Sequence, residues 1–202
     1  MKSGYKLLSY VLSPIVFPIL GTILYFIFLP SFVAKQQVYL IFIMVFGGTY
    51  LLPVLLMGLF KKTATMQYIF DATVQARKFP TLLFLGIMVG IANMLSKVES
   101  VQGLTLFFFG YAVALACVYF FLMIQLKISF HAVAVGGLTA FMICLSHYFA
   151  INLLVPVGVL ILTGGFLLSG RLYLKSPGLK EVFFGYLMGC FGQFLMYGIY
   201  NI

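Results

Sequence analysis

The chain has 202 residues, of which 64% are hydrophobic and 7% charged, and its mean hydropathy is +1.18. An average soluble domain is roughly 45–50% apolar and about 25% charged, so this composition excludes a soluble enzyme, a disordered tail, a coiled coil and a nucleic-acid-binding domain. We therefore expect an all-α, polytopic helical membrane protein, whose formal charge of +9 reflects basic residues in cytoplasmic loops rather than affinity for nucleic acid.

Apolar runs follow one another along the whole chain. A transmembrane helix needs about 20 apolar residues, and we predict a single transmembrane domain, 1–202, with six to seven helices in one bundle. The predicted spans are 7–29, 38–60, 81–95, 104–124, 132–151, 153–169 and 182–202. Residues 61–80 are predicted to form a loop, with room for an amphipathic helix at the membrane surface. A tight turn near Asn152 is predicted to separate the fifth span from the sixth.

The basic residues divide unevenly between the two sides of this topology. With the N-terminus inside, Lys35 and Lys97 alone fall in outer segments, and the rest of the 12 Lys and Arg fall in inner ones. This division favours seven spans with the C-terminus outside. It predicts a multi-pass protein of a cell membrane, and specifically of a bacterial inner membrane. Cys117, Cys144 and Cys190 lie inside apolar runs without metal-ligand spacing, so we expect buried thiols and neither a metal nor a cofactor.

Three polar clusters lie at predicted span ends: residues 77–80, residues 127–131 and residues 169–181. An even number of predicted spans separates each cluster from the next, so all three must face the same side of the membrane. Together they offer several cations, a hydroxyl, an imidazole and a carboxylate. Such a set suits a phosphate group on a lipid, because arginine binds phosphate oxygens through paired donors.

This arrangement resembles the type 2 phosphatidic acid phosphatase superfamily, the membrane lipid phosphatases that share a fold with vanadium haloperoxidases. That family has three motifs: Lys, six residues, Arg-Pro; then Pro-Ser-Gly-His; then Ser-Arg, five residues, His, three residues, Asp. Its third motif is matched best, by Arg171 and, ten residues later, Glu181. The second is matched in part, by Ser129 and His131. The first retains Arg77, but the chain has Phe70 at the lysine position and its proline comes later, at Pro80.

The resemblance implies a role for each matched residue. His131 corresponds to the acid that protonates the leaving group, and Glu181 to the carboxylate that orients the nucleophile. Arg77, Ser129 and Arg171 correspond to phosphate-binding residues, and we add the neighbouring Lys127 to this set.

The family's nucleophilic histidine falls on Pro177, which has no lone pair available for attack on phosphorus. The resemblance therefore implies a pseudoenzyme that lacks its nucleophile. We expect it to bind phosphorylated lipid or to serve as an accessory subunit, with membrane lipids and membrane proteins as its partners.

Two other functions remain open. An active phosphatidic acid or undecaprenyl pyrophosphate phosphatase would need another nucleophile, and His147 is the only other histidine. Sixteen residues of straight helix place His147 about 24 Å beyond His131, which argues against this. A small transporter is the third possibility, although the chain shows no internal repeat of the kind many secondary transporters have.

Simpler roles compete for the same residues. Arg171, Lys175 and Lys180 also fit positive-inside anchors, Glu181 also fits the positive end of a helix dipole, and His131 also fits a helix start at the interface. Sidedness is in conflict as well: family members place the site on the outer face, whereas the basic residues place these clusters inside.

Overall fold

The computed structural model describes residues 13–29, 33–53, 55, 74–173 and 178–200. In these ranges every regular element is helical and no strand occurs. The α-helices are α2 (Phe17–Phe28), α3 (Lys35–Phe46), α6 (Val74–Leu95), α7 (Gln102–Met123), α8 (Phe130–Tyr148), α9 (Leu154–Tyr173) and α10 (Leu179–Tyr200). A π-helical stretch, η1 (Gly47–Leu51), continues α3, and a 3-10 turn, η2 (Glu99–Val101), precedes α7.

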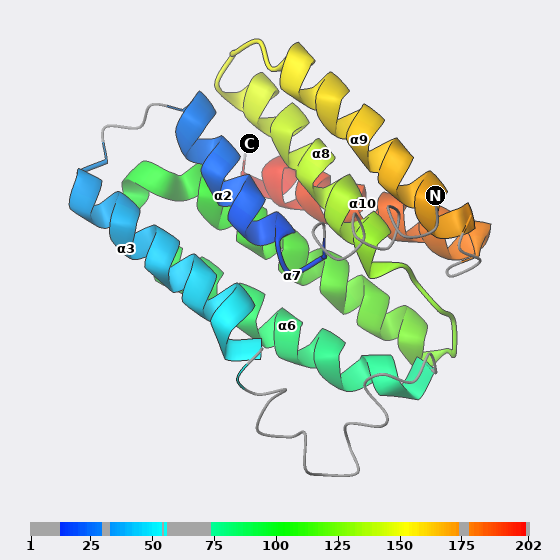
Figure 1. Ribbon diagram of the computed structural model, residues 1–202. Helices are drawn as coiled ribbons and strands as arrows, with labels where there is room; N and C mark the ends of the chain where they lie inside the picture. The colour runs from blue at the N-terminus through cyan, green and yellow to red at the C-terminus, as the bar shows by residue number, and fades with distance from the viewer. Residues whose placement is uncertain (1–12, 30–32, 54, 56–73, 174–177, 201–202) are drawn as a thin grey trace.

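The helices run up and down in a bundle, with their ends gathered at two opposite sides (Figure 1). An α-helix satisfies its backbone groups internally, so an apolar one can lie in hydrocarbon. Within the described residues, four helices are long and apolar enough to cross a membrane: Arg77–Leu95, Glu99–Met123, Phe130–Tyr148 and Leu179–Tyr200. The all-α class is thus confirmed for this part of the chain. The structure supports four spans, and the count of six to seven stays a prediction.

Helix α10 packs against α8 and α7 along a face of glycines. A Cβ added to Gly189 would collide with the Val133 carbonyl of α8, and a Cβ added to Gly136 of α8 would collide with the Tyr186 carbonyl of α10. Gly192 approaches the backbone of α7 in the same way. Small residues of this kind let the backbones of membrane helices approach closely. The three helices therefore form the centre of the bundle.

Side-chain hydrogen bonds to backbone carbonyls also join these three helices. The Tyr111 hydroxyl of α7 donates to the Ala134 carbonyl of α8 at 2.6 Å, and Gln193 Nε2 of α10 donates to the Phe107 carbonyl of α7 at 3.0 Å. Both Tyr111 and Gln193 are buried. Because no water competes for these groups in an apolar core, the bonds fix the relative positions of the helices.

The outer helices expose apolar side chains. Helix α9 contacts α8 where Gly164 lies against Val135, but its outward residues Leu154 and Leu162 are 76% and 74% exposed. In water such a surface would be costly, whereas lipid tails are as apolar as these side chains. The exposed faces therefore fit contact with lipid.

The start of α6 corrects the sequence interpretation. The sequence predicts a loop over residues 61–80, with room for an amphipathic helix at the membrane surface, but residues 74–80 belong to α6, with Pro80 inside the helix. Proline removes one backbone donor and normally ends a helix. Here Val74 and Thr81 are buried on the inner face of α6, and the Thr81 hydroxyl donates to the Arg77 carbonyl at 2.6 Å. Packing of that face and the additional side-chain bond explain why the helix continues through Pro80.

The connection between α8 and α9 lies where the sequence predicts a turn. Helix α8 ends at Tyr148 and α9 begins at Leu154. The Leu154 N–H donates to Asn152 Oδ1 at 3.1 Å, so the Asn152 side chain accepts from an otherwise unpaired donor at the start of α9.

Candidate functional site

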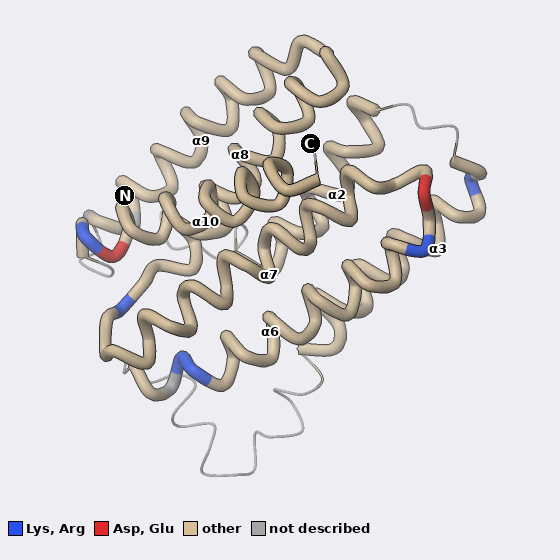
Figure 2. Tube along the Cα trace, turned by 180° about the vertical axis from the view of Figure 1, so that it is seen from behind, with Lys and Arg blue, Asp and Glu red and all other residues tan. Residues whose placement is uncertain are grey.

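Among the described residues, the charged ones lie at the two ends of the bundle and not in its middle (Figure 2). One end is formed by the start of α6, the α7–α8 connection and the start of α10, and we call it the cationic end. Its described charged residues are Arg77, Lys78, Lys127, Lys180 and Glu181. The described members of all three polar clusters thus lie at the same end, as the even number of intervening spans predicts.

Arg77 connects the first cluster to the second. Its guanidinium donates to the Ile128 carbonyl at 3.1 Å, across 51 residues of sequence. Arg77 lies in the first turn of α6, and Ile128 lies in the segment that leads into α8. This bond uses one of the five N–H donors of the guanidinium. The charge of Arg77 is therefore held in place beside the second cluster while further donors remain for an anion.

Ser129 connects the second cluster to the third. Its backbone N–H donates to the Glu181 carbonyl at 3.1 Å. Ser129 precedes α8 as its N-cap residue and is 4% exposed. A Cβ added to Gly185 of α10 would lie 2.7 Å from the Ser129 carbonyl, so only glycine lets α10 approach this closely.

The other matched residues surround this junction. His131 is half-buried in the first turn of α8, and Glu181 is half-buried in the first turn of α10. Lys127 and Lys180 are exposed. The cationic end thus combines exposed ammonium groups with the half-buried guanidinium of Arg77.

Three helices begin at this end, α6 at Val74, α8 at Phe130 and α10 at Leu179. The first N–H groups of a helix lack intrahelical acceptors, and the helix dipole makes this terminus positive. Glu181 supplies one negative charge there. The helix termini and the cations together still favour an anion at the cationic end.

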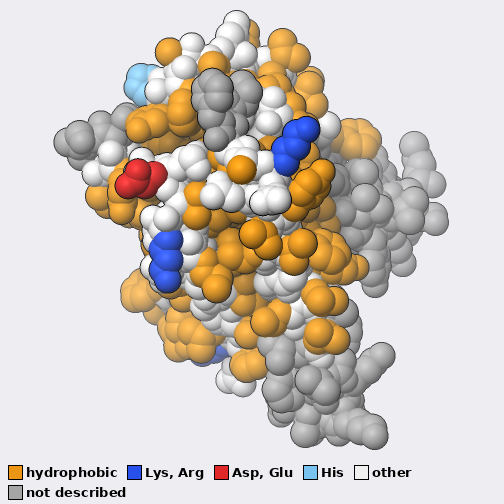
Figure 3. Space-filling model, turned by 90° about the vertical axis from the view of Figure 1, so that its left-hand side faces the viewer, with side chains coloured by type: hydrophobic (Ala, Val, Ile, Leu, Met, Phe, Trp, Pro, Cys, Tyr) orange, Lys and Arg blue, Asp and Glu red, His pale blue; other side chains and the backbone are white. Residues whose placement is uncertain are grey.

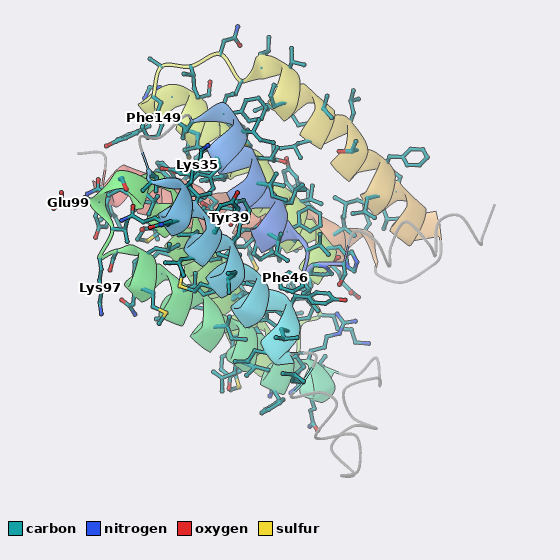
Figure 4. The ribbon with its side chains drawn as sticks, turned by 60° about the vertical axis from the view of Figure 1, so that its left-hand side comes forward. Lys35, Tyr39, Phe46, Lys97, Glu99 and Phe149 are labelled. Atoms are coloured by element: carbon teal, nitrogen blue, oxygen red, sulfur yellow. The ribbon has the colours of Figure 1, made fainter. Side chains whose placement is uncertain are left out.

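The opposite end is less charged. Its described charged residues are Lys35, Lys97 and Glu99, which lie together at one end of the bundle, with Phe149 nearby (Figure 4). A view from this side shows hydrophobic side chains over much of the face, with few and scattered charges (Figure 3). The contrast between the ends singles out the cationic end as the candidate site.

Several predicted site residues lie outside the described part of the chain. Pro177 and Phe70 are among them, as is the side chain of Arg171. The position of Arg171 in the last turns of α9 is described. Helix α9 ends beside the start of α10 in the ribbon (Figure 1), so Arg171 belongs to the cationic end by its place in the fold.

His147 lies away from the site. It is exposed in the last turn of α8, whereas His131 is in the first turn of the same helix. The neighbouring Ser146 hydroxyl donates to the Ile151 carbonyl at 2.7 Å. The two histidines therefore belong to opposite ends of the bundle.

Cysteines and acidic residues are dispersed over the described ranges. No three His, Cys, Asp or Glu side chains there are grouped so that they could hold a metal ion. The cysteines are free: Cys144 is buried, and Cys117 and Cys190 are partly buried.

The sequence interpretation overlooked Gln193. This side chain is fully buried in the middle of α10, and its Oε1 has no hydrogen-bond partner among the described residues. A single amide within an otherwise apolar span is the signal that could have identified it, because polar residues inside membrane helices commonly face other helices.

Comparison of the chain with known protein families, with curated proteins and with solved structures found no match.

Proposed function

We propose that this chain is a multi-pass protein of a bacterial inner membrane that binds a phosphate-bearing lipid headgroup at its cationic end without hydrolysing it. The observation that carries the proposal is the position of Arg77, whose guanidinium donates to the carbonyl of Ile128, the residue before Ser129. A fixed guanidinium loses little conformational freedom when an anion binds. This makes Arg77 the principal phosphate ligand in the proposal.

The surroundings of Arg77 favour a lipid over a free anion. The cationic end lies at the ends of helices that are apolar enough to cross a membrane, and the ends of membrane-spanning helices meet the headgroup region. Lys78, Lys127 and Lys180 add positive charge there. Basic clusters next to membrane helices attract anionic headgroups by about 1 kcal/mol per residue.

The absence of hydrolysis is proposed on chemical grounds. In the resemblance to lipid phosphatases, Pro177 takes the place of the nucleophilic histidine. His147 is separated from His131 by most of the length of α8, about 24 Å at 1.5 Å per residue. A phosphate held near His131 is therefore out of reach of His147.

Lipid binding to purified protein in phosphatidylcholine nanodiscs tests the proposal. Phosphatidic acid should bind the unmodified chain, and Arg77→Leu should weaken binding at least about tenfold, because charge-assisted hydrogen bonds worth about 1.5–3 kcal/mol are lost. The matched control is Lys97→Leu, which removes one positive charge at the opposite end. Equal affinities of the two variants would contradict the proposal.

A further inference from the structure

A cavity of about 200 Å³ lies between the start of α2 and helices α6, α7 and α8. Pro80, Thr81, Phe84 and Met88 form its α6 wall. The facing residues from α7 and α8 are Tyr111, Leu115, Phe130, Val133 and Ala134.

The wall of the cavity is apolar in its chemistry. Ser13, Thr81 and Tyr111 bring hydroxyl groups to it, and the hydroxyls of Thr81 and Tyr111 donate to the backbone carbonyls of Arg77 and Ala134, each at 2.6 Å. A water molecule needs two to four polar partners, and an apolar cavity of about 150 Å³ stays dry and can bind benzene. This cavity therefore suits a hydrocarbon occupant.

The cavity begins directly beneath the cationic end. On α6, Thr81 follows Arg77 by one turn, and on α8, Phe130 follows Ser129 directly. Eight residues separate Pro80 from Met88, so the α6 wall extends about 12 Å along the helix axis. A hydrocarbon chain in the cavity would therefore begin at the level where Arg77 binds an anion.

We propose that the cavity holds the headgroup-proximal part of the hydrocarbon chain of the lipid whose phosphate binds at the cationic end. This inference rests on the proposed function, because the charge of Arg77 is what identifies an anionic amphiphile as the occupant. Two kinds of lipid carry such a hydrocarbon chain: lipids with an acyl chain and lipids with a prenyl chain. Both carry apolar carbon directly next to a phosphate-bearing headgroup.

A pair of matched variants tests the cavity. Met88→Trp fills it, whereas Met94→Trp makes the same change on the outer face of α6, where Met94 is 60% exposed. The ligands are dioctanoyl phosphatidic acid and farnesyl phosphate, each titrated against protein in phosphatidylcholine nanodiscs. We expect Met88→Trp to weaken binding about tenfold, the effect of losing contact with about two methylene groups. Met94→Trp should bind like the unmodified chain. If Met88→Trp weakens the binding of only one of the two ligands, the hydrocarbon chain of that ligand is the type that the cavity holds.

The result separates this inference from the proposed function. If Arg77→Leu loses affinity for phosphatidic acid but Met88→Trp does not, the cavity inference is overturned and the headgroup proposal stands. If dioctanoylglycerol, which has no phosphate, binds as tightly as phosphatidic acid and in a Met88-dependent way, the cavity holds a chain but the headgroup proposal fails.

A second measurement does not depend on how Met88→Trp folds. The chain contains no tryptophan, so Phe84→Trp places the protein's one tryptophan in the cavity wall, where its emission can be excited selectively over that of tyrosine. Phosphatidic acid brominated in its acyl chain should quench this fluorescence more strongly than brominated phosphatidylcholine. Leu82→Trp, at a site 51% exposed on the outer face of α6, should be quenched equally by both lipids. Equal quenching at Phe84→Trp would overturn the inference.

Discussion

A single contact with a backbone carbonyl orients the guanidinium of Arg77. Its guanidinium is anchored to the Ile128 carbonyl, so its direction is set by the fold and not by the ligand. Lysine carries the same charge but lacks the planar group that can bond a carbonyl and a phosphate together. We therefore expect Arg77→Lys to bind phosphatidic acid more weakly than the unmodified chain but more tightly than Arg77→Leu. Equal affinity of Arg77→Lys and the unmodified chain would show that only charge matters.

Glycines in α10 differ sharply in their surroundings. A Cβ on Gly189 would collide with the Val133 carbonyl, whereas a Cβ on Gly198 of the same helix would meet nothing within 4 Å. We expect Gly189→Ala to destabilise the protein by about 1–3 kcal/mol, the usual cost of overpacking. Gly198→Ala should be neutral or stabilising by up to about 1 kcal/mol, because alanine favours helix. Equilibrium unfolding in mixed micelles measures both, and equal effects would contradict the packing described for α10.

At the residue scale, the sequence predicts candidate side chains but no backbone group. The resemblance to a phosphatase motif selected Arg77, Ser129, His131 and Glu181, which the structure places at one end of the bundle. It could not find the Ile128 carbonyl, because every residue has such an acceptor and only the fold brings this one to Arg77.

At the scale of elements, one close contact between α7 and α10 joins Gly110 to Gln193. A Cβ on Gly110 would meet the amide group of Gln193 at about 2.6 Å. We expect Gly110→Ala to destabilise the protein, and a second change, Gln193→Ala, to recover part of that loss because it removes the obstructing amide. A double-mutant cycle of unfolding free energies should thus give a favourable coupling of at least about 0.5 kcal/mol. Strictly additive effects would contradict this contact.

The beginning of α6 marks the limit of sequence reasoning about elements. A polar stretch that ends in Pro80 favours a loop, because proline is unfavourable inside a helix. The helix continues through Pro80 because neighbouring helices bury Val74 and Thr81. Contacts with those helices cannot be predicted from the local sequence. By contrast, the turn at Asn152 could be predicted, because an uninterrupted pair of apolar spans needs a break and asparagine can cap the second helix.

At the scale of the whole molecule, the two ends of the bundle should face opposite sides of the membrane. In a background where the three cysteines are replaced by alanine, we expect Lys127→Cys and Lys180→Cys to react with a membrane-impermeant maleimide from the same side. Lys35→Cys and Lys97→Cys should react from the other side, because they lie at the opposite end of the bundle. Labelling of all four from one side would contradict the membrane-spanning arrangement. The excess of basic residues predicts that the cationic end faces the cytoplasm.

The common location of the three clusters could be predicted from the sequence, because it follows from counting spans and needs no knowledge of packing. The cavity beneath them could not. Its wall combines residues from helices far apart in sequence, and its volume depends on how those helices pack.

Native mass spectrometry of nanodiscs that contain phosphatidic acid is the sharpest test of phosphate binding without hydrolysis, because one sample shows both the bound lipid and any product. We expect intact phosphatidic acid bound to the unmodified chain, loss of that adduct in Arg77→Leu, and no diacylglycerol formed over time. Diacylglycerol produced in molar excess over the protein, and abolished by His131→Ala, would contradict this expectation.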